Sequence, residues 1–447
     1  MSYGAFSCLC ESEKSLGGKI GGHFGATPAL PNRYKQFLLS VPPRDSLRTI
    51  ALCFVVALLE GLDLQAAGVA APHLVREFGL SPAALGWVFP AGLVGLLPGA
   101  VAGGWLADRL GRKRVLIAAV GLFGLFSLLT AHSVSYSQLL AARLVTGLGM
   151  GAALPILIAL SSEVASRELR NMAVSLTYCG VPLGGACAAL IGMFSTVGEW
   201  RLVFYVGGAA PLLVTVLLVF WLPESRVANA RQLSLAQSAA ALLGRRRGGT
   251  TLLLWCSCFC TLMILYLLLN WLPTLLAGRG LSRLDSAFIQ VLFNLGGVVG
   301  VLLAGRLMDR QRALLAVALV YPGMLLALAA LGYLDQPQLL YVAGTLAGAC
   351  AVGGQLILYA LAPRLYPDEV RATGVGVAVA IGRLGSMSGP LMAGQLLAAG
   401  AGVGGLLLAT SPLLVLAAGS VAAVLRHAPD AQVSDAGPLA AAQQPDD

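Results

Sequence analysis

Long apolar segments alternate with short polar connections along most of the chain. A transmembrane helix needs about 20 apolar residues, because each residue adds about 1.5 Å along the helix axis. Twelve segments are long enough, so the pattern predicts an all-α polytopic membrane protein with twelve transmembrane helices. The expected spans are 47–71, 85–107, 114–131, 137–160, 172–194, 202–222, 250–272, 286–307, 313–332, 338–362, 371–397 and 402–425.

One polar connection is much longer than the others and divides the twelve segments into two sets of six. This connection, 223–249, contains three consecutive arginines. It predicts a central loop between an N-terminal half, 47–222, and a C-terminal half, 250–425. The flanking residues, 1–46 and 426–447, are polar, and we expect disordered tails there. A start codon assigned too early would also explain 1–46.

The distribution of lysine and arginine predicts the orientation in the membrane. If the N-terminus is cytoplasmic, 23 of the 29 basic residues fall in cytoplasmic segments and four fall in outer loops. The other two, Arg143 and Arg383, fall inside helices. We therefore expect a protein of a bacterial-type inner (plasma) membrane, with both tails and the central loop in the cytoplasm.

The two halves carry an internal repeat that becomes visible when the chain is shifted by 201 residues. Gly104-x-Leu106-x-Asp108-Arg109 then falls on Gly305-x-Leu307-x-Asp309-Arg310. The same offset places Glu168-x-Arg170 on Glu369-x-Arg371, Gly147 on Gly348, Gly184 on Gly385 and Pro211 on Pro412. One ungapped offset that gives all of these matches predicts two homologous six-helix halves.

The composition agrees with a membrane protein and excludes several other classes. Hydrophobic residues make up 57% of the chain, charged residues make up 11%, and the mean hydropathy is +0.82. A soluble domain carries about 25% charged residues. The net charge of +9 is spread between the apolar segments, so it forms no patch for nucleic acid. The four histidines are scattered and no G-x-x-x-x-G-K-[ST] run is present. Neither a metal-dependent enzyme nor an ATP-driven pump is predicted, and no metal or cofactor is expected.

Two acids, Glu60 and Asp63, stand in the middle of the first apolar segment. They are three residues apart, so they project from one face of a helix. An ionised acid at the centre of a bilayer costs at least about 2.5 kcal/mol, so such residues usually face a cavity and have a function. We interpret Glu60 and Asp63 as a proton-coupling pair. The alternative is an acid near a helix end that reaches water.

Two arginines also lie inside predicted spans. Arg383 is twelve residues into the eleventh segment, too deep to reach water easily. It therefore requires a carboxylate partner, either a substrate anion or Glu60 or Asp63 when the site is empty. Arg143 lies nearer the outer end of its segment. It either reaches the membrane surface, or acts as a cation that tunes an acid or meets an anionic substrate.

Further polar side chains at central depth are candidates for contact with a substrate, although each could instead make a hydrogen bond between helices. The candidates for substrate binding are Gln65, Tyr178, Asn270, Gln355 and Tyr359, and Tyr266 and Asn294 lie at a similar depth.

The loop after the second segment has the pattern of a gate. Its run from Gly104 to Arg114 matches the G-x-L-x-D-R-x-G-R-K/R-x signature of the major facilitator superfamily. Gly104 permits close helix approach, and Asp108 can pair with an arginine across helix ends. A basic loop that only sets orientation would explain Arg112 but not Asp108. The predicted gate residues are Gly104, Asp108, Arg109 and Arg112, with Gly305, Asp309 and Arg310 as their counterparts in the second half.

The acidic pair also carries a resemblance to a family. It resembles the D-G-x-D motif of the aromatic acid:proton symporters within that superfamily, with Glu60 in place of the first Asp. Across about 48–425, further stretches are similar to the 3-(3-hydroxyphenyl)propionate transporters of this family. They are EGLDLQAA at 60–67, TGLGMGAALP at 146–155, YCGVP at 178–182, NWLP at 270–273, RATGVG at 371–376 and GRLGSMSGPL at 382–391.

The resemblance implies a secondary transporter of the major facilitator fold that imports an aromatic carboxylate by proton symport with alternating access. Glu60 and Asp63 would then couple the proton, and Arg383 would engage the carboxylate. We separately expect a monomer. The main alternative is a proton-coupled antiporter that exports drugs or other metabolites on the same fold. Such a protein typically needs an anionic pocket for a cation, and Arg383 argues against that.

Overall fold

The computed structural model is helical throughout the residues that it describes, which are 44–165, 170–194, 200–223, 247–310, 312–366 and 368–433. Most of the predicted tails and central loop lies outside these ranges, but residues 426–433, which were predicted to begin a disordered tail, are helical because α16 continues to Val433. Twelve helical spans are long and apolar enough to cross a bilayer, which confirms the predicted twelve-helix architecture. The helices are α3 (Arg44–Phe78), α4 (Pro82–Leu110), α5 (Arg112–Ala131), α6 (Tyr136–Val164), α7 (Arg170–Phe194), α8 (Arg201–Trp221), α10 (Gly248–Gly278), α11 (Arg283–Asp309), α12 (Ala313–Tyr333), α13 (Pro337–Leu365), α14 (Asp368–Ala398), α15 (Val403–Ala409) and α16 (Ser411–Val433).

Several helices extend beyond the apolar segments that predicted them. The first was expected to end at residue 71, but α3 continues past Pro72 to Phe78. A contact with another helix stabilises these extra turns, because Arg201 of α8 donates hydrogen bonds to the carboxylate of Glu77. The twelfth span is divided between α15 and α16, with a break at Thr410, just before Pro412. Polar flanks and tertiary contacts thus set helix ends that hydropathy alone does not define.

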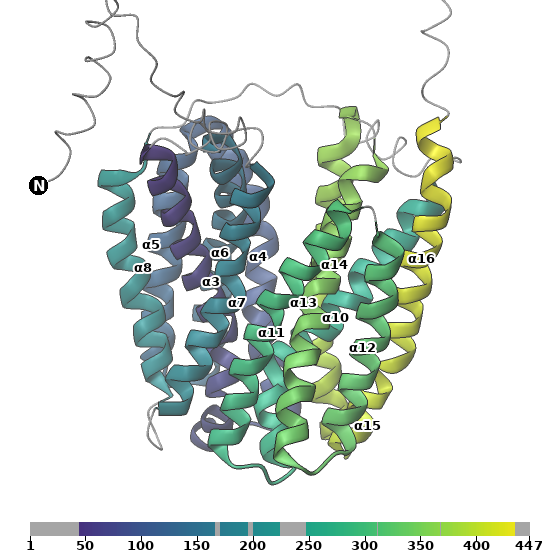
Figure 1. Ribbon diagram of the computed structural model, residues 1–447. Coiled ribbons are helices and arrows are strands. Elements are labelled where there is room, and N and C mark those ends of the chain that lie inside the picture. Colours follow the sequence, from purple (N-terminus) through teal and green to yellow (C-terminus); the bar gives the residue numbers. More distant parts are fainter. Residues whose placement is uncertain are drawn as a thin grey trace, which may run out of the picture. The chain divides into compact units, whose positions relative to one another are not determined.

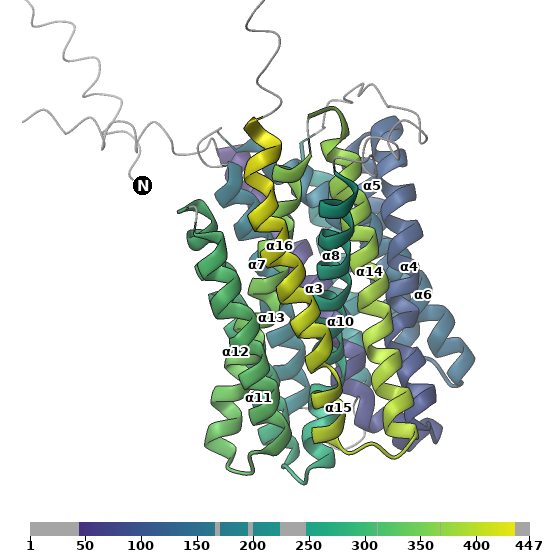
Figure 2. The same ribbon diagram turned by 90° about the vertical axis from the view of Figure 1, so that its right-hand side faces the viewer.

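The helices pack as two sets with equivalent contacts, which Figure 1 shows side by side, whereas the C-terminal set faces the viewer in Figure 2. In the N-terminal half, α4 packs along α6, and α3 packs along α7. In the C-terminal half, α11 packs along α13, and α10 packs along α14. A shift of 201 residues carries the first pair of contacts onto the second, so the repeat in the sequence is also a repeat of packing.

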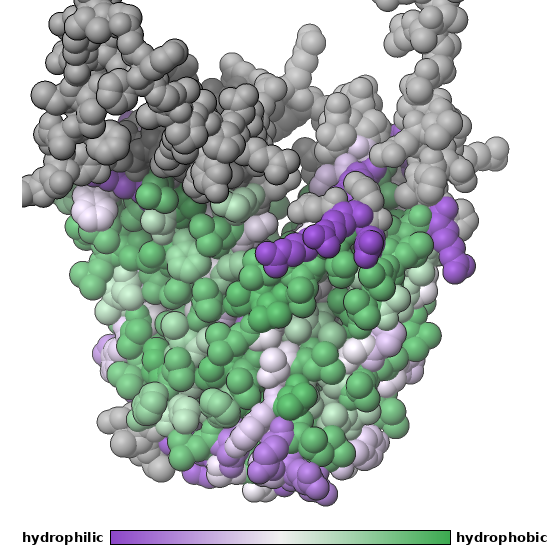
Figure 3. All heavy atoms as spheres, viewed as in Figure 1, coloured by the Kyte–Doolittle hydropathy of each residue, from purple (hydrophilic) through white to green (hydrophobic). Residues whose placement is uncertain are grey.

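Glycines of the repeat permit the closest of these contacts. A Cβ added to Gly147 of α6 would overlap the backbone of Gly92 in α4. A Cβ added to Gly348 of α13 would overlap the backbone of Phe293 in α11, which is the equivalent crossing. Membrane helices associate through such small residues because lipid offers no hydrophobic driving force between them. Apolar side chains cover most of the face of the bundle seen in Figure 3, and hydrophilic ones lie mainly toward its upper and lower parts.

The two halves meet mainly at one end of the bundle. We call the end where α3 begins and α16 ends the termini side, and the other end the opposite side (Figure 1). On the opposite side, a Cβ on Gly86 of α4 would lie 3.2 Å from the Cα of Gly394 in α14. Nearby, the ring centroids of Phe89 (α4) and Trp271 (α10) are 5.4 Å apart. Arg283 of α11 donates a 2.9 Å hydrogen bond to the carbonyl oxygen of Gly192 in α7.

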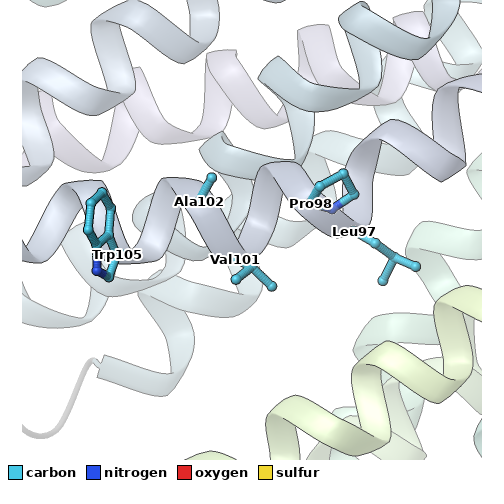
Figure 4. A pocket seen from close by; sticks show the side chains of 5 residues that line it. All are labelled: Leu97, Pro98, Val101, Ala102 and Trp105. Carbon is cyan, nitrogen blue, oxygen red and sulfur yellow. The ribbon is translucent and has the colours of Figure 1, made fainter.

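On the termini side, α4 and α14 are not packed against each other at the equivalent glycines. Gly104 lies 18 residues, or about five helical turns, after Gly86, so both glycines occupy one face of α4. Gly376 and Gly394 have the same spacing on α14. Nothing lies within 4 Å of a Cβ added to Gly104 or Gly376. An apolar groove runs along this part of α4 (Figure 4), lined by Leu97, Pro98, Val101, Ala102 and Trp105.

Candidate substrate and proton site

The helix α3 carries both predicted acids into the interior of the bundle. Glu60 and Asp63 are 1% and 0% exposed. Gly61 between them lies against the backbone of Val181 in α7, at a distance that leaves no space for a side chain. The Oε2 atom of Glu60 is buried without a hydrogen-bond partner. A buried carboxylate with no partner is costly, whereas a protonated carboxyl group is not. Glu60 is therefore in a position to carry a proton.

Asp63 has its partners within its own half. Ser127 of α5 donates a 2.7 Å hydrogen bond to Oδ1 of Asp63. The Nη2 atom of Arg143, from α6, lies 2.9 Å from Oδ2 and donates a 3.1 Å hydrogen bond to the backbone carbonyl of Asp63. Its N–H points at this carbonyl and not at Oδ2, so the contact with the carboxylate is an ion pair without hydrogen-bond geometry. Arg143 thus reaches neither the surface nor the other half.

Arg383 of α14 is also buried, at 7% exposure, but it has a different environment. Its Nη1 atom donates a 2.6 Å hydrogen bond to the hydroxyl oxygen of Tyr266 in α10. Within the described ranges, no carboxylate lies within 4 Å of its guanidinium. A charge on Glu60 would act on Arg383 from a longer distance. Arg383 therefore does not form an ion pair with Glu60 or Asp63 in this conformation, although such a pair was one of its two predicted alternatives. Asp63 forms its ion pair with Arg143 instead.

Aromatic side chains from both halves surround Arg383. The ring centroids of Tyr178 (α7) and Tyr359 (α13) are 6.5 Å apart and the rings meet edge to face. Gln355 of α13 donates a 3.2 Å hydrogen bond to the hydroxyl of Tyr359. Tyr178, Tyr266, Tyr359 and Glu60 all lie close enough to Arg383 for a charge on any of them to act on its guanidinium. We call these five residues, Glu60, Tyr178, Tyr266, Tyr359 and Arg383, the central cluster.

Gln65 and Asn270, which were predicted to bind substrate, form hydrogen bonds with other helices or with their own helix through their side-chain amides. Gln65 and Asn294 of α11 exchange hydrogen bonds of 2.7 Å and 2.9 Å. Gln290 donates a third hydrogen bond, of 2.8 Å, to Oε1 of Gln65. Asn270 donates a 2.8 Å hydrogen bond to the backbone oxygen of Tyr266, one turn earlier in α10.

The predicted gate is only partly described. The side chains of Asp108 and Asp309 lie outside the described part of the chain. The Cζ atom of Arg109 lies 3.9 Å from the ring centroid of Trp105 in the same helix. Arg112 forms an ion pair with Glu163 near the end of α6.

The glycines of the gate differ from the expectation. Gly104 makes no close helix contact in this conformation, because α14 is not packed there, and the neighbouring Gly103 packs against Ala152 instead. Gly305 has a side-chain atom of Leu356 at an ordinary contact distance of 3.8 Å from an added Cβ. Arg310 follows the end of α11 and is exposed.

Sequence reasoning missed three residues of the site. Ser127 looks like any small residue of an apolar helix, and no sequence pattern connects it with Asp63. Glu163 is a helix-end acid without a predicted partner. Gln290 could have been found, because it lies four residues before Asn294 and shares its helix face.

Within the described ranges, no three His, Cys, Asp or Glu side chains come together as a metal site.

The comparison with known families identifies the fold of this site. Residues 53–390 match the Major Facilitator Superfamily. The chain belongs to this superfamily. A solved structure of the nucleoside transporter NupG, in a single-residue mutant form, has a TM-score of 0.70 at 16% identity, over 85% of this chain and all of that one.

Similar curated proteins are transporters of aromatic acids. The "3-(3-hydroxy-phenyl)propionate transporter" of Escherichia coli (strain K12) is 50% identical over 83% of this chain and 91% of its own length. The "4-hydroxybenzoate transporter PcaK" of Pseudomonas aeruginosa is 39% identical over 79% of this chain and 86% of its own. These matches confirm the resemblance to aromatic acid transporters. The protein is a multi-pass membrane transporter, not an enzyme.

Proposed function

We propose that this transporter imports an aromatic carboxylate of the 3-(3-hydroxyphenyl)propionate type together with a proton. The observation that carries the proposal is the pairing of an arginine that has no carboxylate partner with an acid that has no hydrogen-bond partner. Arg383 and Glu60 lie in one cluster between the two halves. A buried guanidinium calls for an anion, and the described residues supply none within 4 Å. The substrate would supply it.

The carboxylate of the substrate binds at Arg383 and Tyr266. One N–H of the guanidinium is directed to the hydroxyl oxygen of Tyr266. Its other N–H groups have no acceptor among the described residues, and two of them form the planar fork that suits a carboxylate. The hydroxyl hydrogen of Tyr266, also without a described acceptor, can donate to the same anion. The rings of Tyr178 and Tyr359 then offer edges and faces to the aromatic part of the substrate.

Proton coupling follows from the charge balance of this cluster. Arg383 carries one positive charge, and an ionised Glu60 would balance it from a distance. A substrate carboxylate would repel an ionised Glu60 in this low-dielectric environment, so substrate and proton bind most favourably together. Asp63 lies in an ion pair with Arg143 of its own half. In the proposed cycle Glu60 carries the proton, and Asp63 with Arg143 holds α3 in register for this task.

Alternating access is supported by the packing of α4 against α14. The two helices meet at Gly86 and Gly394 and are apart at Gly104 and Gly376, five turns away on the same faces. A rocking motion of the halves would exchange these contacts. The charge distribution of the loops predicts that the termini side is cytoplasmic, and on that assignment this conformation would be open to the cytoplasm. The gate residues around Asp108 and Asp309 would then close that side. One chain holds both halves, and we propose that a monomer is sufficient.

The test is uptake into inverted or right-side-out proteoliposomes with an imposed pH gradient. Radiolabelled 3-(3-hydroxyphenyl)propionate should accumulate when the outside is acidic, and a protonophore should abolish the accumulation. The matched amide of the same compound should not compete, because it cannot pair with Arg383. Accumulation that survives the protonophore would overturn proton coupling. Outward movement of an organic cation in exchange for protons, without carboxylate uptake, would establish the antiporter instead.

A further inference from the structure

A buried cluster of three amides joins the two halves on the opposite side of the bundle. Gln65 of α3 and Asn294 of α11 form a reciprocal amide pair, and Gln290 adds a hydrogen bond from one turn earlier in α11. All three side chains are buried. We call Gln65, Gln290 and Asn294 the amide latch. Its hydrogen bonds run from one half to the other, unlike the contacts of Asp63, which remain within the N-terminal half.

The latch lies between the central cluster and the opposite side. Gln65 follows Glu60 by five residues in the direction of the opposite-side end of α3. Gln290 and Asn294 belong to the part of α11 that begins on that side at Arg283. A side chain on Gly185 of α7 would overlap the amide of Gln65 and approach Asn294 at 2.6 Å. Helices α3, α7 and α11 are thus in close contact at Gln65 and Asn294.

The internal repeat relates the amide latch to a second contact between the two halves. Gln290 of α11 corresponds to Phe89 of α4 under the shift of 201 residues. Gln290 contacts α3 of the other half, and Phe89 contacts Trp271 on α10, which is the repeat equivalent of α3. One crossing between the halves is therefore closed by amides and its pseudo-symmetric counterpart by aromatic rings. Gln290 and Phe89 thus occupy equivalent positions in the two repeats, and each makes a contact between the halves on the opposite side.

We propose that the amide latch holds the opposite side shut in this conformation and must break before that side opens. The inference rests on the alternating access proposed above. It gives Gln65 a role in closure, not in direct contact with the substrate. Hydrogen bonds between membrane helices are individually weak, so a small group of them can form and break during a transport cycle. Neutral amides also keep their strength whether or not a proton or a substrate anion is present.

The experiment measures opening on the opposite side without substrate. Spin labels at Ser81→Cys and Ala398→Cys, both exposed at the opposite-side ends of α4 and α14, report the separation of the halves by pulsed electron paramagnetic resonance. Each lost hydrogen bond should raise the ratio of open to closed forms about three-fold, which corresponds to the average of about 0.6 kcal/mol for such bonds. Gln290→Leu should therefore give about a three-fold increase. Asn294→Leu, which loses both bonds to Gln65, should give about an eight-fold increase.

Two further variants keep the result interpretable. Gln65→Leu removes all three hydrogen bonds of the latch at once, so it should give the largest increase in the ratio of open to closed forms, about 20-fold. Thr146→Val is the control, because the buried Thr146 hydroxyl bonds only to Ala142 in its own helix and should not affect the distances. Unchanged distances in both Gln290→Leu and Asn294→Leu would overturn the latch. A wild type that shows no open form at any pH or substrate concentration would instead contradict alternating access itself.

Discussion

Arg143 and Arg383 are both buried arginines of this transporter, and they differ in how their charge is balanced. Arg143 lies 2.9 Å from a carboxylate oxygen of Asp63 and bonds to the backbone of the same residue. Arg383 has a tyrosine hydroxyl as its hydrogen-bond partner and no carboxylate within reach among the described residues. The N-terminal half thus completes its charge pair internally, whereas no described carboxylate pairs with the cation of the C-terminal half. We propose that this difference separates a structural arginine from one that binds the substrate.

The largest expected effect is on folding. Arg143→Met leaves the buried Asp63 with Ser127 as its remaining described side-chain partner, and the loss of one partner from a buried pair costs about 3–5 kcal/mol. Arg383→Met removes a cation that no described carboxylate contacts, so it should not lower stability. Thermal unfolding of the purified proteins in detergent measures both. Asp63→Asn in the Arg143→Met background should recover part of the loss. An equal loss of stability in the two Met variants would remove the distinction between the arginines.

The second effect is on substrate affinity. Arg383→Lys keeps the charge but loses the planar fork. A charge-assisted hydrogen bond contributes about 1.5–3 kcal/mol, so the apparent affinity should weaken on the order of 10- to 100-fold. Arg383→Ala should abolish carboxylate uptake. Uptake is measured against both substrate concentration and pH. A shifted pH profile with an unchanged concentration dependence would show that Arg383 acts through Glu60 and does not bind the carboxylate.

The third effect separates the two acids. Glu60→Gln cannot carry a proton, so a pH gradient should no longer drive accumulation, which for one proton is worth about ten-fold per pH unit. Exchange of labelled for unlabelled substrate needs no net proton movement and should continue. Glu77→Gln is the control, because Glu77 pairs with Arg201 at the end of α3, away from the central cluster. Gradient-driven accumulation by Glu60→Gln would assign the proton to another group.

The sequence predicted the components of this site better than their pairing. Span number and the repeat are encoded in long apolar segments, and the acids and arginines stand out because charge is rare at that depth. The partner of each residue is harder to predict from the sequence. Asp63 and Arg143 lie 80 residues apart and meet only through the packing of α3 against α6. Gln65 was predicted to bind substrate, yet its amide is bonded to α11. Polar character indicates the need for a partner, and only packing decides which partner it is.

The smallest predicted effect concerns the two hydroxyls that accompany the two arginine sites. Ser127 donates to Asp63, which is paired with Arg143, and Tyr266 accepts from Arg383. Ser127→Ala should lower stability by about 1 kcal/mol, the net value of one hydrogen bond, and leave the apparent affinity near wild type. Tyr266→Phe removes a proposed donor to the substrate, so a similar energy should appear as an affinity about five-fold weaker, with the maximal rate retained.

Tyr321→Phe is the matched control for the tyrosine, because its hydroxyl bonds to Thr261 and does not reach Arg383. It should change stability alone. Kinetics and thermal unfolding of the three variants together show where each hydroxyl acts. If Ser127→Ala weakened the affinity as much as Tyr266→Phe, the pair of Asp63 and Arg143 would belong to the substrate site. If only Tyr266→Phe did so, the anion would be bound from the C-terminal half, with the N-terminal half supplying the proton through Glu60.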